Sequence, residues 1–223
     1  IGNTTSQYLV DISSLDIQTN NSAVEDIYVG SYMTINAVND VLLNLPNAEN
    51  VDQDIKTRLL AESHFIRGLV YFNLVRMIGP VPLVDAPATS IESAHKKRAP
   101  IDQIYELIIS DFTEAWNTLP EPGSQPKGRP HKYAAQAYLA KVYVAMACIK
   151  EHPGDPFDAS WLDKDADYYW EEAYNRALDV YNNGGYSLVE NFADLWQWDN
   201  KYTKESIFEL EENKVTGSCS FMY

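Results

Sequence analysis

The chain of 223 residues has 45% hydrophobic and 22% charged side chains, a composition typical of globular proteins and unlike that of a disordered chain or a coiled coil. Its length allows one large domain or two small ones with a substantial core. The 32 Asp and Glu residues outnumber the 17 Lys and Arg residues, and the resulting net charge of −15 repels phosphate backbones and anionic lipid head groups. We therefore expect a packed soluble domain that does not bind nucleic acid.

The sequence contains no membrane-spanning pattern and little information on redox state. Its longest apolar run, residues 142–149, is far shorter than the roughly 20 residues that span a bilayer. Cys148 and Cys219 are compatible with a disulfide or with two free thiols, and no Cys-x-x-Cys pair indicates a zinc knuckle. Ile1 opens neither a signal peptide nor an initiator-Met start, so we expect the chain to begin inside a longer or processed protein.

Apolar residues repeat with helical spacing in three segments of the N-terminal half. The first covers residues 23–45 and is followed by Pro46-Asn47; the second covers 52–78 and is followed by Gly79-Pro80. The second is apolar over so wide an arc that it should be packed on most sides. The third, 101–119, has one apolar stripe opposite polar residues, which predicts an amphipathic helix that covers a core.

Two more helices follow a loop rich in Pro and Gly at residues 120–130. The fourth, 132–150, is apolar almost throughout and rich in Ala, which indicates a central helix that neighbours approach closely. The fifth begins near Asp167, a plausible N-cap, and ends at Gly184-Gly185. Its predicted buried face consists of Trp170, Ala173, Tyr174, Ala177, Leu178 and Tyr181.

After the fifth helix the pattern changes to short extended segments at 186–189 and 206–210, separated by an irregular or single-turn helical element at 192–198.

Five antiparallel helices predict an all-α fold of stacked helix hairpins, similar to tetratricopeptide repeats. The loops are too long for a strict array with a period of roughly 34 residues. We expect three regions: a polar loop region at 1–22, a helical-hairpin domain at 23–185 and the start of a loop-rich region at 186–223.

No known catalytic or metal-binding motif occurs in the sequence, which lacks HExxH, GxSxG, the P-loop and GxGxxG. Asp163, Asp165 and Asp167 alternate as in a calcium loop, but Tyr168 and Tyr174 occupy the positions that require Gly and Glu in an EF-hand. These acids are better explained as helix-start residues facing the dipole. The sequence therefore offers no candidate catalytic residues, no cofactor is expected, and calcium binding is left open.

One long stretch resembles the "EARFLRAxxYFNLVRxxGxVPLV" segment of the SusD/RagB family of outer-membrane nutrient-binding lipoproteins. Shorter matches in the same order include Tyr32-x2-Ile35-x3-Asn39, Gly128-Arg129 and Lys204-Glu205-Ser206-Ile207-Phe208-Glu209, so the likeness covers about residues 25–212. The long stretch reads Glu62-x2-Phe65-Ile66-Arg67-Gly68-x2-Tyr71-Phe72-Asn73-Leu74-Val75-Arg76-x2-Gly79-Pro80-Val81-Pro82-Leu83-Val84.

The resemblance implies a lipoprotein on the outer face of a Gram-negative outer membrane, anchored by a lipid outside this chain. Such a protein captures polysaccharides, oligosaccharides or peptides, performs no catalysis and caps a SusC-like TonB-dependent transporter. Members of the family are considerably longer, so we expect this chain to be an internal fragment. Gly68 stands where the family more often has Ala, which suggests close backbone contact. Glu62 and Arg67, five residues apart on a buried helix, are expected to bind backbone groups or neighbouring helices and not substrate.

By analogy with the family, part of the ligand site lies in the polar loop before the Tyr-x2-Ile-x3-Asn helix. Here this loop covers about residues 14–22, and the candidate ligand-binding residues are Asp16, Gln18, Asn20 and Asn21. The structural alternative is a solvated loop in which Asn21 or Ser22 caps the helix.

Aromatic side chains are the natural platforms for sugar rings, but most lie on the helical stripes. Trp116 and Trp170 are assigned to the core by periodicity, whereas Trp161, Trp196 and Trp198 lie outside the long helices and are expected to cover helix ends. Two rival functions remain open. Helical repeats also bind peptides as adaptors, and helix-pair folds support glycosidases with two catalytic carboxylates about 5 to 10 Å apart.

Overall fold

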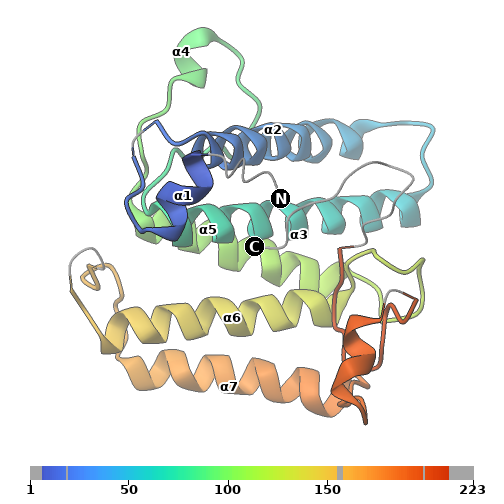
Figure 1. Ribbon diagram of the computed structural model, residues 1–223. Helices are drawn as coiled ribbons and strands as arrows, with labels where there is room; N and C mark the ends of the chain where they lie inside the picture. Colours follow the sequence, from blue (N-terminus) through green and yellow to red (C-terminus); the bar gives the residue numbers. More distant parts are fainter. Residues whose placement is uncertain (1–6, 19, 155–157, 198, 211–223) are drawn as a thin grey trace, which may run out of the picture.

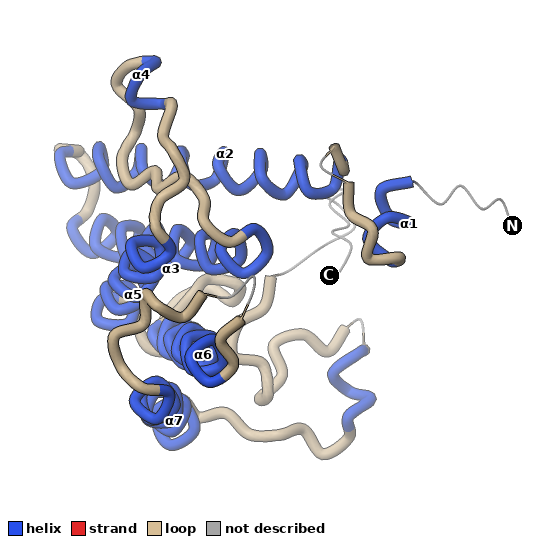
Figure 2. The backbone as a smooth tube through the Cα atoms, turned by 90° about the vertical axis from the view of Figure 1, so that its left-hand side faces the viewer, coloured by secondary structure: helices blue, strands red, loops and turns tan. Residues whose placement is uncertain are grey.

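The computed structural model describes residues 7–18, 20–154, 158–197 and 199–210. Five long helices follow one another in antiparallel succession, and each packs against the preceding one (Figures 1 and 2). The described ranges contain no strand, and Pro82 and Arg98 form an isolated antiparallel bridge. The long helices are α2 (Ser22–Asn44), α3 (Gln53–Ile78), α5 (Ile101–Thr118), α6 (Lys132–Glu151) and α7 (Ala166–Asn183). The predicted all-α class is confirmed.

The helix ends follow local chemistry. The backbone turns from α2 into a 3-10 turn, η1 (Leu45–Asn47), because Pro46 cannot continue an α-helix. The Asp52 side chain caps α3 by accepting from the backbone N–H groups of Asp54 and Ile55. The N-cap predicted for the fifth helix is wrong by two residues: Asp165 accepts from the N–H of Tyr168 at 2.9 Å, and Asp167 lies in the first turn.

The core lies between α3, α5 and α6, with smaller contributions from α2 and α7. The side chains of Phe65 and Phe112 meet edge to face, with ring centres 5.6 Å apart. A Cβ on Gly68 would lie 3.3 Å from the Asp111 Cβ and 3.4 Å from the Phe112 ring, which confirms the predicted close approach at this glycine. The central position of α6 is also confirmed, because it packs on both α5 and α7.

The predicted face of α7 is only partly buried. Ala173 is buried as expected, together with Tyr169 and Val180, but Tyr174 and Tyr181 are 64% and 79% exposed. Trp170 is also exposed, and its indole N–H donates to Glu151 at 3.3 Å. The physical reason is that α7 is the last long helix in the described part of the chain and contacts only α6, so a second apolar side finds no neighbour.

Several short elements differ from expectation. Two short helices, α1 (Gln7–Ser13) and α4 (Ile91–Ala94), were not predicted, and α4 lies at the tip of a loop that projects from the bundle (Figure 2). The expected extended segments 186–189 and 206–210 form no strand, although the Ser187 N–H donates to the Lys204 carbonyl at 3.0 Å. The expected helical turn is present as a 3-10 helix, η2 (Phe192–Trp196).

None of the helices in the described part of the chain is long and apolar enough to cross a membrane. Cys148 is exposed on α6, and Cys219 lies outside the described residues.

Candidate functional site

The polar loop before α2 exposes three of its four candidate ligand-binding side chains. Asp16, Gln18 and Asn20 are all exposed. The structure brings two of them together, because the Gln18 amide nitrogen donates to the Asp16 carboxylate at 2.9 Å. The carboxylate accepts hydrogen bonds and the amide group can also donate them, so together they can bind a sugar hydroxyl, which both donates and accepts.

Asn21 is placed differently, since it is only 4% exposed. Its side-chain oxygen accepts from the Ala23 N–H at 3.1 Å and caps α2, while its amide nitrogen donates to the Tyr8 carbonyl of α1 at 3.1 Å. Both ends of the amide therefore join α1 to α2. Asn21 supports the loop that presents the three exposed side chains.

A buried polar cluster joins the helices near the middle of the bundle. The Arg67 guanidinium makes two hydrogen bonds of 2.8 Å to the Asp111 carboxylate and a third, also of 2.8 Å, to the Asn39 side chain. It also donates to the Asp85 carbonyl at 3.2 Å, and the His64 ring nitrogen lies 2.7 Å from Asp111. These contacts connect α2, α3, α5 and the loop after α3.

The charge of this cluster is stabilised internally. Burial opposes the charged form of Arg67, but the hydrogen bond and the attraction to Asp111 outweigh it, and the pKa of Arg67 is raised. The prediction that Arg67 binds neighbouring helices is confirmed. Glu62 likewise accepts from Arg129 at 2.7 Å and ties α3 to the loop before α6.

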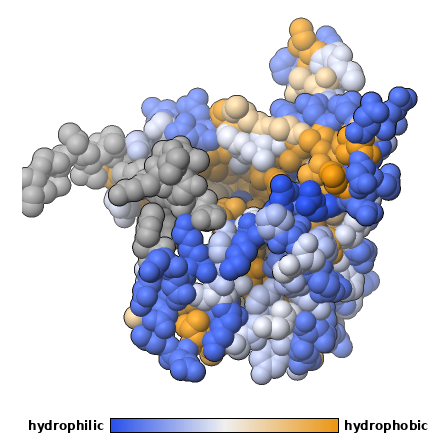
Figure 3. All heavy atoms as spheres, turned by 90° about the vertical axis from the view of Figure 1, so that its right-hand side faces the viewer, coloured by the Kyte–Doolittle hydropathy of each residue, from blue (hydrophilic) through white to orange (hydrophobic). Residues whose placement is uncertain are grey.

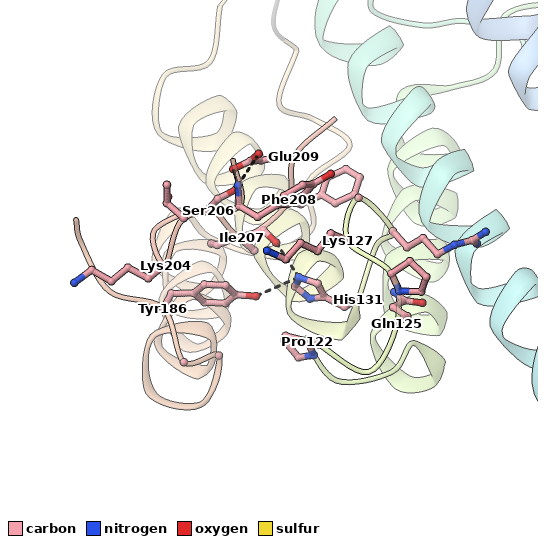
Figure 4. Close-up of a pocket in the computed structure, with 18 residues that line it drawn as sticks. Pro122, Gln125, Lys127, His131, Tyr186, Lys204, Ser206, Ile207, Phe208 and Glu209 are labelled. Atoms are coloured by element: carbon pink, nitrogen blue, oxygen red, sulfur yellow. Dashed lines mark hydrogen bonds between the residues drawn. The ribbon is translucent and has the colours of Figure 1, made fainter. Parts of the chain in front are cut away.

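A pocket of about 280 Å³ lies where α6 begins and α7 ends. Two segments far apart in sequence form it, residues 122–131 before α6 and residues 184–209 after α7 (Figure 4). We call it the loop pocket. Seen from this end, the lower half of the molecule is mainly hydrophilic, and apolar side chains gather higher up, at the level of α2 and α3 (Figure 3).

His131 joins the two walls of the loop pocket. Its Nδ1 accepts from the Ala134 N–H at 3.3 Å and caps α6, so its Nε2 bears the proton and donates to the Ile207 carbonyl at 2.8 Å. Burial lowers the pKa of His131, although the hydrogen bond to Ile207 opposes the shift. The Tyr186 hydroxyl oxygen lies 3.2 Å from the same Nε2, and burial raises the pKa of Tyr186 to about 12.

The loop pocket was not predicted from the sequence. His131 is one of four histidines in the chain, and no sequence motif marks it. The available signals were the glycines and prolines of residues 120–130 and the Gly184-Gly185 pair, which mark loops but do not indicate that the loops lie side by side.

Of the tryptophans outside the long helices, Trp161 packs on Tyr105 with ring centres 4.7 Å apart, Trp196 is 67% exposed, and Trp198 lies outside the described residues.

The described residues offer no obvious metal centre, because no three His, Cys, Asp or Glu side chains among them converge. The three alternating acids act locally at the start of α7. Asp165 caps the helix, and the Asp163 carboxylate accepts from the Tyr169 hydroxyl at 3.1 Å and from the Lys164 ammonium at 2.9 Å.

Comparison with known proteins gives a consistent result. The family model described as "Starch-binding associating with outer membrane", SusD-like, matches residues 3–144. A SusD-like protein of Bacteroides ovatus is 28% identical over 184 residues, which cover 82% of this chain and 32% of the relative. The chain spans about a third of the length of the first two curated relatives that it matches.

Solved structures share the fold. A laminarin-binding SusD-like protein superposes with a TM-score of 0.78 and 25% identity, over 93% of this chain and 41% of that one. A SusD superfamily protein from Parabacteroides distasonis gives a TM-score of 0.72 and 29% identity, over 86% of this chain and 38% of that one. With the family model matching more than half of its residues, the chain belongs to the SusD-like family.

Proposed function

We propose that this chain is the helical part of a cell-surface glycan-binding lipoprotein that captures oligosaccharides and delivers them to a SusC-like TonB-dependent transporter. The observation on which the proposal rests is the family match over residues 3–144, whose description links starch binding to the outer membrane. The likeness to a structure described as laminarin-binding supports an oligosaccharide as ligand. The outer face of the outer membrane and the lipid anchor are parts of the same proposal.

The proposed contact region on this chain is the polar loop. Asp16, Gln18 and Asn20 are exposed and carry carboxylate or amide groups that can hydrogen-bond to sugar hydroxyls. Asn21 fixes the loop against α1 and α2. Neutral sugars bind through hydrogen bonds to such amide and carboxylate groups together with apolar contacts. Further contacts would come from the longer protein that the family relatives represent.

Catalysis is not proposed. The buried carboxylates that the structure describes are engaged in its own framework: Asp111 binds Arg67 and His64, and Glu62 binds Arg129. A retaining or inverting glycosidase needs two carboxyl groups facing a common substrate cleft. The peptide-binding adaptor remains the principal alternative, because stacked helix hairpins also bind extended peptides.

The first experiment is affinity electrophoresis and calorimetry of the chain with laminarin and other glycans, accompanied by a reducing-sugar assay. We expect retardation by at least one glycan without sugar release. Gln18→Ala should weaken binding roughly two- to tenfold, the effect of one lost hydrogen bond. The exposed Gln103→Ala on α5 is the matched control and should leave binding unchanged.

Two outcomes would contradict the proposal. Released reducing sugar would identify a hydrolase, and the absence of retardation by every glycan, with binding of peptides from a random library, would favour the adaptor.

A further inference from the structure

Three of the long helices, α3, α6 and α7, together line a hollow on the side of the bundle. Its volume is about 510 Å³, within the range of about 300 to 1,000 Å³ that is usual for ligand sites. We call it the aromatic groove. None of its lining residues belongs to the polar loop or to the loop pocket. They are Phe72 and Arg76 of α3, Ala140, Lys141, Val144 and Ala145 of α6, and Trp170, Ala173, Tyr174 and Ala177 of α7.

The aromatic groove exposes apolar side chains. Val144, Trp170 and Tyr174 are all exposed, and the four alanines of the lining fill little of the space beside them. Exposed apolar surface gathered in one place is typical of interaction sites, and Trp and Tyr are enriched among the residues that contribute most to binding. The groove is therefore a candidate docking surface.

The charge of the aromatic groove is opposite to that of the whole protein. The chain has 32 acidic and 17 basic residues, yet the lining contains Arg76 and Lys141 and no Asp or Glu. Neither cation forms an ion pair within the part of the chain that the structure describes. The Arg76 guanidinium donates to the Asn73 side chain at 2.8 Å, and the Lys141 ammonium lies 5.0 Å from the centre of the Tyr138 ring. Both positive charges are thus available to a carboxylate.

The polar groups of the lining suit carboxylates better than sugar hydroxyls. Arg and Lys side chains only donate hydrogen bonds, and the Trp170 N–H already donates to Glu151 at 3.3 Å. Among the lining side chains, only the Tyr174 hydroxyl can also accept. A sugar face presents several hydroxyls that both donate and accept, so most of them would find no acceptor here.

The length of the aromatic groove suits a helical segment. On α7 the lining extends from Trp170 to Ala177, which corresponds to two turns or about 10 Å of helix. An amphipathic helix that binds in a groove inserts apolar side chains at i, i+3 or i+4 and i+7, which is the same length. Because α7 contacts only α6 among the described helices, a further helix can lie beside it.

We propose that the aromatic groove docks a helical segment of a partner protein, whose apolar side chains enter the groove and whose carboxylates pair with Arg76 and Lys141. Charge complementarity selects this occupant. Two copies of the groove facing each other would bring Arg76 and Lys141 of one copy against the same cations of the other, which disfavours a symmetric dimer. The inference does not depend on glycan binding, because it concerns a protein ligand at a different place.

The test measures the fluorescence anisotropy of two labelled synthetic peptides added to the full chain. The acidic probe is an amphipathic peptide of Leu and Glu with about 18 residues, long enough to form a helix. The basic probe has Lys in place of every Glu. We expect the acidic probe to bind at least about tenfold more tightly than the basic one, and its affinity to fall as salt is added.

Two substitutions in the groove, each with a matched control, locate the binding. Tyr174→Ala should weaken binding of the acidic probe about fivefold or more, whereas Tyr181→Ala, on the same helix and exposed outside the lining, should change it less than about twofold. Lys141→Glu should weaken it about tenfold, whereas Lys97→Glu, on the exposed segment after α4, changes the net charge equally and should have little effect. Thermal unfolding of each variant verifies the fold.

Four outcomes would overturn this inference. The acidic probe does not bind up to about 1 mM, or the basic probe binds equally well. Lys97→Glu weakens binding as much as Lys141→Glu, which would mean that only net charge matters. Sedimentation velocity without peptide shows self-association that Tyr174→Ala abolishes, which would identify a second copy as the occupant. A neutral oligosaccharide displaces the acidic probe, which would identify the groove as a sugar site.

Discussion

The buried polar cluster around Asp111 and the loop pocket handle buried polar atoms in opposite ways. In the cluster, the Asp111 carboxylate is matched by Arg67 and His64, and Arg67 also donates to Asn39 and to the Asp85 carbonyl. In the pocket, Gln125 and Thr203 each leave an atom unpaired among the described residues. The paired groups of the cluster join helices, whereas a buried polar atom without a partner costs stability, so the two regions should respond differently to the loss of a polar group.

The largest expected effect comes from breaking the cluster. Asp111→Ala leaves the buried Arg67 guanidinium without its carboxylate, and we expect the free energy of unfolding to fall by about 3 to 5 kcal/mol. Urea unfolding followed by circular dichroism measures the change. The control is Glu114→Ala, an exposed residue of the same helix, which should change stability by less than about 0.5 kcal/mol. A loss at Asp111 below about 1 kcal/mol would contradict the framework role.

A second comparison concerns two adjacent asparagines in the polar loop. Asn21→Ala removes the cap of α2 and the bond to Tyr8, so we expect a loss of about 1 kcal/mol in unfolding free energy. Asn20→Ala, next to it and exposed, should have little effect on stability. Equal losses in the two variants, measured by urea unfolding, would show that the buried amide is not what holds the loop.

In the loop pocket, removal of a polar group should not lower the free energy of unfolding. Thr203→Val replaces an unpaired buried hydroxyl by a methyl group of similar size, so we expect unfolding free energy to stay constant or to rise by up to about 1 kcal/mol. Destabilisation by more than about 1 kcal/mol would mean that the hydroxyl has a structural partner.

The smallest expected effect is a pH dependence at His131. Burial lowers its pKa below the usual 6.5, so the unfolded chain binds this proton more readily than the folded chain. The stability that His131 provides is complete above about pH 6.5 and decreases as the pH falls below that value. Urea midpoints between about pH 7.5 and pH 5.5 measure it. In His131→Asn, which keeps a neutral cap, the decrease should be smaller than in the unmodified chain.

The helices could be predicted from the sequence because their apolar arcs are long and their ends carry strong signals. In α3 and α6 the apolar positions surround most of the helix, so burial follows wherever the neighbours lie. The face of α7 could not be predicted, because periodicity finds apolar side chains without indicating whether a neighbour covers them. Tyr174 and Tyr181 lie on such an uncovered side.

The candidate sites divide in the same way. The cap at Asn21 follows from local chemistry, and it was foreseen as the alternative to ligand binding. The loop pocket forms where the segment that contains Gln125 lies beside the segment that contains Thr203. These segments are far apart in the chain, and no sequence pattern of either one indicates the other as its neighbour. Local sequence signals describe turns at both places, but only the packing of α6 against α7 brings them together.

The bonds of Arg67 have a consequence for the way the bundle opens. One side chain is hydrogen-bonded to α2, α5 and the loop after α3, in addition to lying on α3 itself. Amide hydrogens in these elements should therefore exchange with solvent in one cooperative event, whereas α7, held by α6 alone among the described helices, should exchange earlier. The bundle is thus a rigid block of helices that loses its outermost helix first.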